Sequence, residues 1–129
     1  MNVNPQAAWR RRKKSAEAIR AILVERFPKC FMPKGERKVP LKIGIYYDIR
    51  KLCPDLSSRK ISRALSDYTS GRTYRRSMIA GACRLDLDGW PVGFVTTDEA
   101  EEARERLLKA DRNVARKETL GGDIGAIAQ

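Results

Sequence analysis

Residues 83–95 constrain the fold of this chain most, because they have the pattern of a β-hairpin between segments of helical periodicity. Residues 83–88 alternate between apolar and polar side chains, as a half-buried strand does. An Asp-Gly pair at 88–89 favours a tight turn, and residues 92–95 return as a second strand. Two short strands do not form a stable sheet by themselves. We therefore expect a mostly helical α+β domain, in which about five helices support one small hairpin.

The helices are expected in segments that have apolar periodicity or clear boundary signals. The first three are expected at residues 6–27, 41–52 and 57–68. A short basic helix is expected at 72–79, and a final helix begins in the capping-box sequence at 96–99. The buried positions that we expect on the four longer helices recur every three or four residues: Ala16, Ile19, Leu23 and Phe27; Leu41, Ile45, Ile49 and Leu52; Ile61, Ala64, Leu65 and Tyr68; Ala100, Ala103, Leu107 and Ala110.

The chain is expected to contain one folded domain, at residues 15–112. Residues 1–14 form a basic N-terminal arm or an extension of the first helix, and their cluster at 10–14 is either solvated or in contact with phosphates. The helical pattern weakens after about residue 116, so we expect residues 113–129 to be a frayed or disordered tail.

Basic residues exceed acidic ones, with 27 Lys and Arg against 16 Asp and Glu and a net charge of +11. Such an excess predicts a polyanionic partner or an anionic membrane surface. No apolar run approaches the roughly 20 residues of a membrane span, and the basic N-terminus is not followed by the apolar segment of a signal peptide. We therefore expect a cytoplasmic protein that does not bind a membrane.

Residues that are common in catalytic and metal sites are scarce. The chain has no histidine, the commonest general base and metal ligand. Cys30, Cys53 and Cys83 form no C-x-x-C pair, so we expect reduced thiols in or near the core. The alternative is a magnesium-dependent nuclease site at Asp86 and Asp88, but no third acidic ligand accompanies them. We expect no metal, no cofactor and no catalytic residue.

A basic concavity is expected where polar sides of several short elements meet, formed by Lys42, Arg59, Arg63, Tyr74 and Arg84. Its cations suit phosphates, and Tyr74 suits stacking on a base or a bond to a ribose hydroxyl. Both Tyr74 and Arg84 have a structural alternative. Tyr74 is then an interior ring with its hydroxyl at the rim, and Arg84 forms a salt bridge with Asp86, Asp88 or an acid of the final helix.

The turn Thr69-Ser70-Gly71-Arg72 is a second candidate for anion binding. Free backbone N–H groups and hydroxyls at this turn suit a phosphate or a terminal ribose. The alternative is an ordinary interhelix turn in which Ser70 caps the next helix. That next helix is basic and adds Arg75 to the expected contacts.

Several blocks of the chain, in matching order and spacing, resemble the ProQ/FinO domain from about Ala16 to Leu108. The blocks are Arg26-Phe27-Pro28-Lys29-Cys30-Phe31, Pro40-Leu41-Lys42-Ile43-Gly44-Ile45, Ala64-Leu65 with Tyr68-Thr69-Ser70, Tyr74, and Gly81-Ala82-Cys83-Arg84-Leu85-Asp86-Leu87-Asp88-Gly89.

The resemblance implies the ProQ/FinO fold and a bacterial RNA chaperone that acts in post-transcriptional regulation by small RNAs. Proteins of this family bind structured RNAs, notably terminator hairpins with a single-stranded 3′ tail. On the matched positions the implied contacts are Lys42, Tyr74 and Arg84, with the Thr69-Ser70 turn near the RNA 3′ end. The pair Asp86 and Asp88 then orients Arg84.

The chain departs from the family pattern on the third helix. Ser58 and Ser62 stand where some relatives have basic residues, whereas Arg59, Lys60 and Arg63 lie at neighbouring helical angles.

These observations predict a monomeric, non-enzymatic RNA-binding protein whose partners are structured RNAs, including small RNAs and mRNA 3′ ends. The alternative is a double-stranded DNA-binding regulator that places residues 61–68 or the basic N-terminal helix in a groove. The expected RNA contacts are Lys42, Arg59, Arg63, Thr69, Ser70, Arg72, Tyr74, Arg75 and Arg84.

Overall fold

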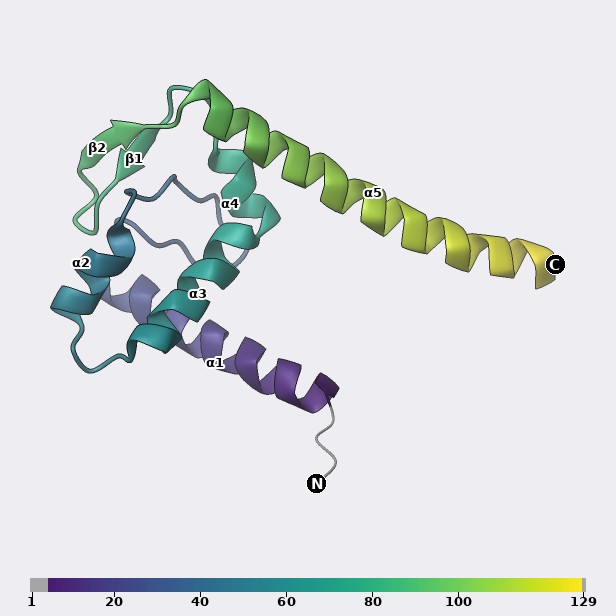
Figure 1. Ribbon diagram of the computed structural model, residues 1–129, viewed down its shortest axis with the longest axis horizontal. Helices are drawn as coiled ribbons and strands as arrows, with labels where there is room; N and C mark the ends of the chain where they lie inside the picture. The colour runs from purple at the N-terminus through teal and green to yellow at the C-terminus, as the bar shows by residue number, and fades with distance from the viewer. Residues whose placement is uncertain (1–4, 129) are drawn as a thin grey trace.

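The computed structural model describes residues 5–128, with side chains for residues 5–118. This part of the chain forms five helices and one antiparallel hairpin (Figure 1), which is the mostly helical α+β fold that the sequence predicts. The elements in chain order are α1 (Pro5–Arg26), α2 (Ile45–Leu52), α3 (Ser58–Ser70), α4 (Arg72–Ser77), β1 (Cys83–Leu85), β2 (Pro91–Phe94) and α5 (Thr97–Ala128).

Helix α3 lies at the centre of the domain and packs against α1, α2 and α4 (Figure 1). Its side chains Ile61, Ala64 and Tyr68 are buried, and the T-shaped contact between Tyr68 and Phe31 fixes the loop after α1 on the core. Each large apolar side chain that is fully buried contributes about 1.5–3 kcal/mol to stability. The expected inner faces of α1 and α3 are confirmed, with Ala16, Ile19 and Leu23 buried on α1 and with Phe27 and Leu65 partly buried.

The helix expected at 41–52 begins later, at Ile45. Gly44 precedes it with φ +83°, a left-handed conformation that ends the preceding segment and that glycine adopts without strain. Leu41 instead forms a parallel bridge with Leu85, so residues 40–42 lie along β1 as a short third segment. Leu52 was expected inside and is 61 % exposed, because the inner face continues at intervals of four residues to Cys53.

The hairpin is shorter than residues 83–95, and its strands are joined by a turn that Asp86 organises. The Asp86 Oδ1 accepts hydrogen bonds from the backbone N–H groups of Asp88 and Trp90, both at 2.9 Å. The strand register has an irregularity between Arg84 and Leu85. Cys83, expected in or near the core, is exposed because it lies on the outer side of β1, whereas Cys30 and Cys53 are buried as predicted.

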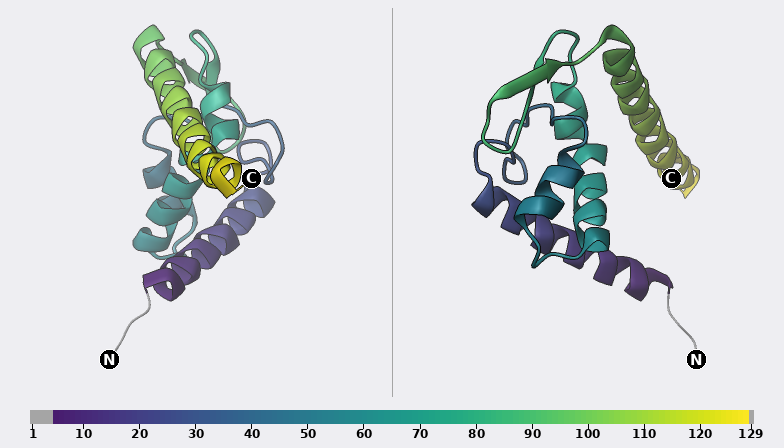
Figure 2. Two further views of the ribbon diagram at one scale, coloured as in Figure 1. Left: turned by 90° about the vertical axis from the view of Figure 1, so that its right-hand side faces the viewer. Right: turned by 60° about the vertical axis from the view of Figure 1, so that its left-hand side comes forward.

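Helix α5 begins in the predicted capping box and then extends away from the body of the domain (Figure 2). The Thr96 N–H donates to Glu99 Oε1 at 2.9 Å, and the Glu99 N–H donates to Thr96 Oγ1 at 3.2 Å. Ala103 is buried on the inner face of the helix. The helix continues through the glycine pair at 121–122, because a helical glycine costs only about 1 kcal/mol. Residues 5–14 belong to α1, and the proposed domain boundaries stay a prediction.

Candidate nucleic-acid interface

Tyr74 and Arg84 both bind the backbone of Leu41, Tyr74 at its N–H and Arg84 at its carbonyl. The Leu41 N–H donates to the Tyr74 hydroxyl at 3.1 Å, and the Leu41 carbonyl accepts from a terminal guanidinium nitrogen of Arg84 at 2.7 Å. Both side chains are 7 % exposed, and burial raises the pKa of Tyr74. For both residues the structure therefore agrees with the alternative given above, in which the side chain is part of the interior. They hold residues 40–42 against β1 and leave little of their own surface open.

Arg84 faces inward, although the strand pattern placed it on the polar side of β1. Its second terminal nitrogen donates to Glu99 Oε2 at 2.7 Å, and this ion pair joins β1 to the first turn of α5. Its Nε has no hydrogen-bond partner within the described residues. The pKa of Glu99 is lowered, first by the hydrogen bond from the Thr96 backbone and further by Arg84.

The pair Asp86 and Asp88 does not orient Arg84, which is a correction to the sequence-based expectation. The Asp86 carboxylate is occupied by backbone N–H groups of its own turn, and the acid that holds Arg84 is Glu99. Across the described part of the chain, no group of three or more potential ligands is placed to hold a metal ion.

Lys42 follows Leu41 directly and lies at the surface beside this anchored peptide. Its backbone N–H donates to the Leu85 carbonyl at 2.9 Å, so the β1 contact fixes its position. Its Nζ donates to Asp48 Oδ2 at 2.8 Å, and this hydrogen bond raises the pKa of Lys42. The Lys42 side chain is 39 % exposed, so an anion that competes with Asp48 can reach its amine.

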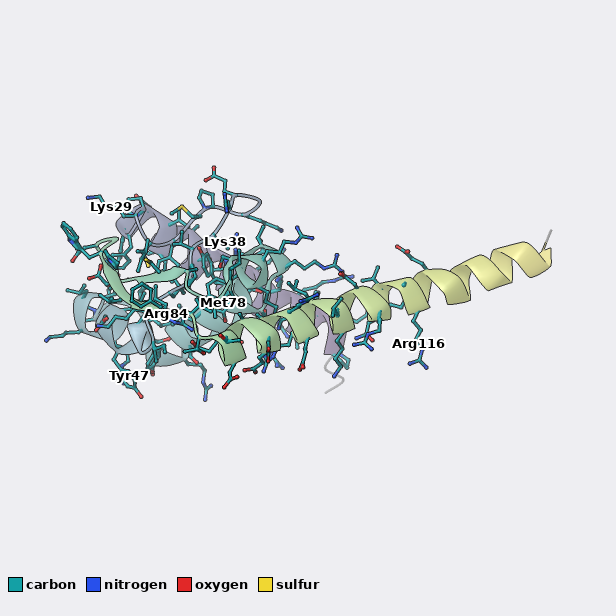
Figure 3. The ribbon with its side chains drawn as sticks, turned by 90° about the horizontal axis from the view of Figure 1, so that it is seen from above. Lys29, Lys38, Tyr47, Met78, Arg84 and Arg116 are labelled. Atoms are coloured by element: carbon teal, nitrogen blue, oxygen red, sulfur yellow. The ribbon has the colours of Figure 1, made fainter. Side chains whose placement is uncertain are left out.

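A groove of about 240 Å³ lies between the end of α3, helix α4 and the beginning of α5, and we call it the α3–α5 groove. It brings together the expected contacts Thr69, Tyr74 and Arg75. The lining also includes Met78, which Figure 3 places beside the start of α5. Helix α5 contributes the side chains that sequence analysis missed, at the i, i+3, i+4 and i+7 spacing of one helical face: Glu99, Glu102, Ala103 and Arg106.

Arg63 and Ser70 do not line this groove. They lie in a second groove, between α1 and α3, so the single concavity expected from the sequence is divided in two. Successive residues on a helix are about 100° apart, and Thr69 and Ser70 therefore face different grooves. Arg59 is exposed on α3 and lines neither of these two grooves.

The turn at residues 69–72 joins the end of α3 to the start of α4, and its expected role in anion binding stays a prediction. Thr69 and Ser70 are the last residues of α3, and the Thr69 hydroxyl donates to the Leu65 carbonyl at 2.9 Å. The Ser70 hydroxyl donates back to the Asp67 carbonyl and makes no cap on α4, so the capping alternative is wrong. Arg72 forms an exposed ion pair with Asp111 at 3.2 Å.

No helix among residues 5–128 combines the length and the apolar character needed to cross a bilayer.

Comparison with known proteins gives a consistent result. The family model described as the ProQ/FINO family matches residues 12–119. The chain is 39 % identical over 104 residues to the RNA chaperone ProQ of Aeromonas salmonicida (strain A449), covering 78 % of this chain and 49 % of the relative. It is 41 % identical over 107 residues to the RNA chaperone ProQ of Idiomarina loihiensis, covering 81 % and 50 %. The chain thus spans about half the length of the curated relatives it matches.

Solved structures with the same fold include the NMR solution structure of a ProQ homolog from Legionella pneumophila. It has a TM-score of 0.65 and 29 % identity, and the match covers 82 % of this chain and 84 % of the homolog. A FinO-like RNA chaperone from Neisseria meningitidis MC58 has a TM-score of 0.61 and 26 % identity, with 71 % and 93 % covered.

Proposed function

The chain belongs to the ProQ/FinO family, and from this premise we propose that it is a non-enzymatic, RNA-binding RNA chaperone. Its relatives carry that description, and its own charge of +11 suits a polyanion. The preferred RNA is a terminator-type hairpin with a single-stranded 3′ end. The partners are small RNAs and mRNA 3′ ends in the cytoplasm, which the chain binds as a monomer in post-transcriptional regulation.

The observation that carries this proposal is the anchored peptide of Leu41. Two buried polar side chains, Tyr74 and Arg84, hold it from both sides, and Lys42 follows it at the surface. A rigid backbone support beside a lysine presets the position of the amine, which reduces the entropy lost when a phosphate binds. In this proposal Lys42 contacts the RNA backbone, and Arg84 positions residues 40–42.

The α3–α5 groove is the proposed site of the RNA 3′ end. Thr69 offers a hydroxyl group for a terminal ribose beside the edge of Tyr74, and Arg75 and Arg106 offer charge for the last phosphates. The Glu99 carboxylate accepts hydrogen bonds from free ribose hydroxyls, and the charges of Glu99 and Glu102 repel a terminal phosphate. The groove therefore favours an unmodified 3′ end. Arg59 and Arg72 contribute long-range attraction.

The test is a binding titration of a terminator hairpin that ends in either a 3′ hydroxyl or a 3′ phosphate. We expect the 3′ phosphate to weaken binding about tenfold, the result of losing good hydrogen bonds and adding repulsion. Equal affinity for both ends contradicts the 3′-end assignment. Displacement of the RNA by duplex DNA at equal concentration contradicts RNA selectivity, and cleavage of the RNA in Mg²⁺ contradicts a non-enzymatic role.

A further inference from the structure

A second basic groove, of about 360 Å³, lies between the first half of α1 and the side of α3 that faces it, and we call it the α1–α3 groove. The side chains that line it are Trp9, Arg12, Lys13, Ala16, Arg63, Ser66, Asp67 and Ser70. The residues around the anchored Leu41 peptide are absent from this lining. The groove is therefore separate from the site proposed above.

The groove keeps a positive charge after its internal ion pairs are counted. Its acid, Asp67, accepts hydrogen bonds from Lys13, which lines the groove, and from Arg20, which does not. Arg12 of α1 and Arg63 of α3 both line the groove, and neither has an ion-pair or hydrogen-bond partner among residues 5–118. Two cations without a carboxylate partner suit a ligand that brings more than one negative charge.

An aromatic side chain lies at the same groove. Trp9 is 63 % exposed, so most of its indole surface is open to a ligand. The hydroxyls of Ser66 and Ser70 line the opposite wall on α3. An open aromatic ring beside cations and hydroxyls is the set of groups that holds a single nucleic-acid strand, because bases stack on the ring while the cations follow the phosphates.

We propose that the α1–α3 groove binds a single-stranded RNA segment, with a base on Trp9 and phosphates between Arg12 and Arg63. This inference rests on the proposed function for its choice of RNA as the polyanion. It adds a second RNA contact, in which Arg12 of α1 and Arg63 of α3 supply the charge. A domain with two RNA contacts holds two segments near each other, which raises the local concentration for pairing.

The test uses the fluorescence of Trp9 in a Trp90→Phe background, where Trp9 is the one indole left. Trp90 is 69 % exposed in the hairpin, so its replacement leaves the core intact. The probe is a non-self-complementary single-stranded RNA of about 12 nucleotides, within the roughly 4–16 nucleotides that an OB-fold single-strand-binding domain covers. We expect the RNA to quench Trp9. In the double variant Arg12→Ala/Arg63→Ala we expect about tenfold weaker binding. The slope of log affinity against log salt concentration should become shallower by about 1.4, because two phosphate contacts are lost.

The matched control is Arg116→Ala/Lys117→Ala, which removes the same charge from the exposed, projecting part of α5 (Figure 3). We expect it to weaken binding less than about twofold, because distant exposed charges are screened. An unquenched Trp9, or equal losses in the two double variants, overturns the proposal. Equal quenching by duplex DNA or by polyglutamate overturns it too, because the groove then attracts any polyanion.

The outcome separates this inference from the proposed function. If the terminator hairpin binds normally but Trp9 is not quenched, the α1–α3 groove is wrong and the proposed function stands. If the hairpin shows no 3′-end preference while the single strand quenches Trp9, the groove stands and the 3′-end assignment is wrong.

Discussion

The guanidinium of Arg84 and the carboxylate of Glu99 lie 2.7 Å apart and join β1 to the first turn of α5. The same guanidinium donates to the Leu41 carbonyl, so one side chain links three segments that are distant in sequence. Its own exposure is only 7 %. Arg84 therefore determines how the hairpin, residues 40–42 and α5 sit together, in addition to any contact that it makes with a ligand.

Replacing Arg84 with alanine is expected to lower the free energy of unfolding by about 3–5 kcal/mol, because a buried carbonyl and a carboxylate lose their partner. Urea unfolding measures the loss. Arg104→Ala, on an exposed side of α5, is the control and should change stability by less than about 0.5 kcal/mol. A stability of Arg84→Ala close to wild type contradicts the linking role, and any loss of RNA affinity then reflects direct contact.

The Tyr74 hydroxyl is expected to stabilise the fold, and to affect RNA affinity only through that structural role. In Tyr74→Phe the ring stays and the buried Leu41 N–H loses its acceptor, which costs about 1–3 kcal/mol. Tyr47→Phe is the control, because Tyr47 is 70 % exposed. Thermal unfolding and hairpin-RNA titration should be measured on both. Weaker RNA binding by a Tyr74→Phe protein of unchanged stability contradicts this positioning role and favours a direct hydroxyl contact.

The local pattern of the sequence predicted the elements well where one face of an element is buried. The apolar positions of α1 and α3 and the capping box of α5 depend on residues close in sequence, so periodicity and spacing identify them. The start of α2 depends on the left-handed conformation of Gly44 and on the bridge between Leu41 and Leu85. A partner 44 positions away leaves no local pattern, so that boundary was missed.

The candidate site was harder to predict for the same reason. Alternation along residues 83–88 identified Leu87 as buried. The inward direction of Arg84 depends on Glu99, an acid whose local pattern indicates only a helix cap. Periodicity placed Arg63 and Ser70 on polar sides of α3. Which groove each one faces depends on where α1 and α5 pack, and only the tertiary structure contains that information.

Protonation of Asp67 is expected to cause part of the loss of folding stability at acid pH. Burial alone works to raise the pKa of Asp67, but hydrogen bonds from Lys13 and Arg20 outweigh it, so the pKa lies below its ordinary 3.8. A lowered pKa in the folded state means that the stabilisation is present above the unfolded value and is lost as the pH falls through the folded value. The ion pairs of Asp67 thus stabilise the protein at neutral pH and fail below about pH 4.

Asp67→Asn should therefore lower the free energy of unfolding by about 1–3 kcal/mol near neutral pH, the range for hydrogen bonds to charged groups. The difference from wild type should close as the pH falls toward about 2. Urea unfolding across this range measures it, with the exposed Asp88→Asn as control. A difference that stays constant with pH indicates that Asp67 acts through packing instead of charge.

Replacing Glu102 with glutamine is expected to increase the affinity for RNA. Glu102 lies in the wall of the α3–α5 groove and holds Arg106 at 2.6 Å. Glu102→Gln removes a negative charge from the groove and frees the guanidinium for phosphate. At about 4 Å in water one such charge contributes about 1 kcal/mol, so we expect hairpin RNA to bind about two- to fivefold more tightly.

Glu105→Gln is the matched control for this gain. It makes the same change in net charge on an exposed side of the same helix, three residues further along, and Glu105 does not line the groove. If RNA passes through the α3–α5 groove, Glu102→Gln should improve affinity clearly more than Glu105→Gln at low salt. The advantage should shrink as salt screens the charge. Equal gains from both variants indicate a general electrostatic effect and place the RNA elsewhere on the domain.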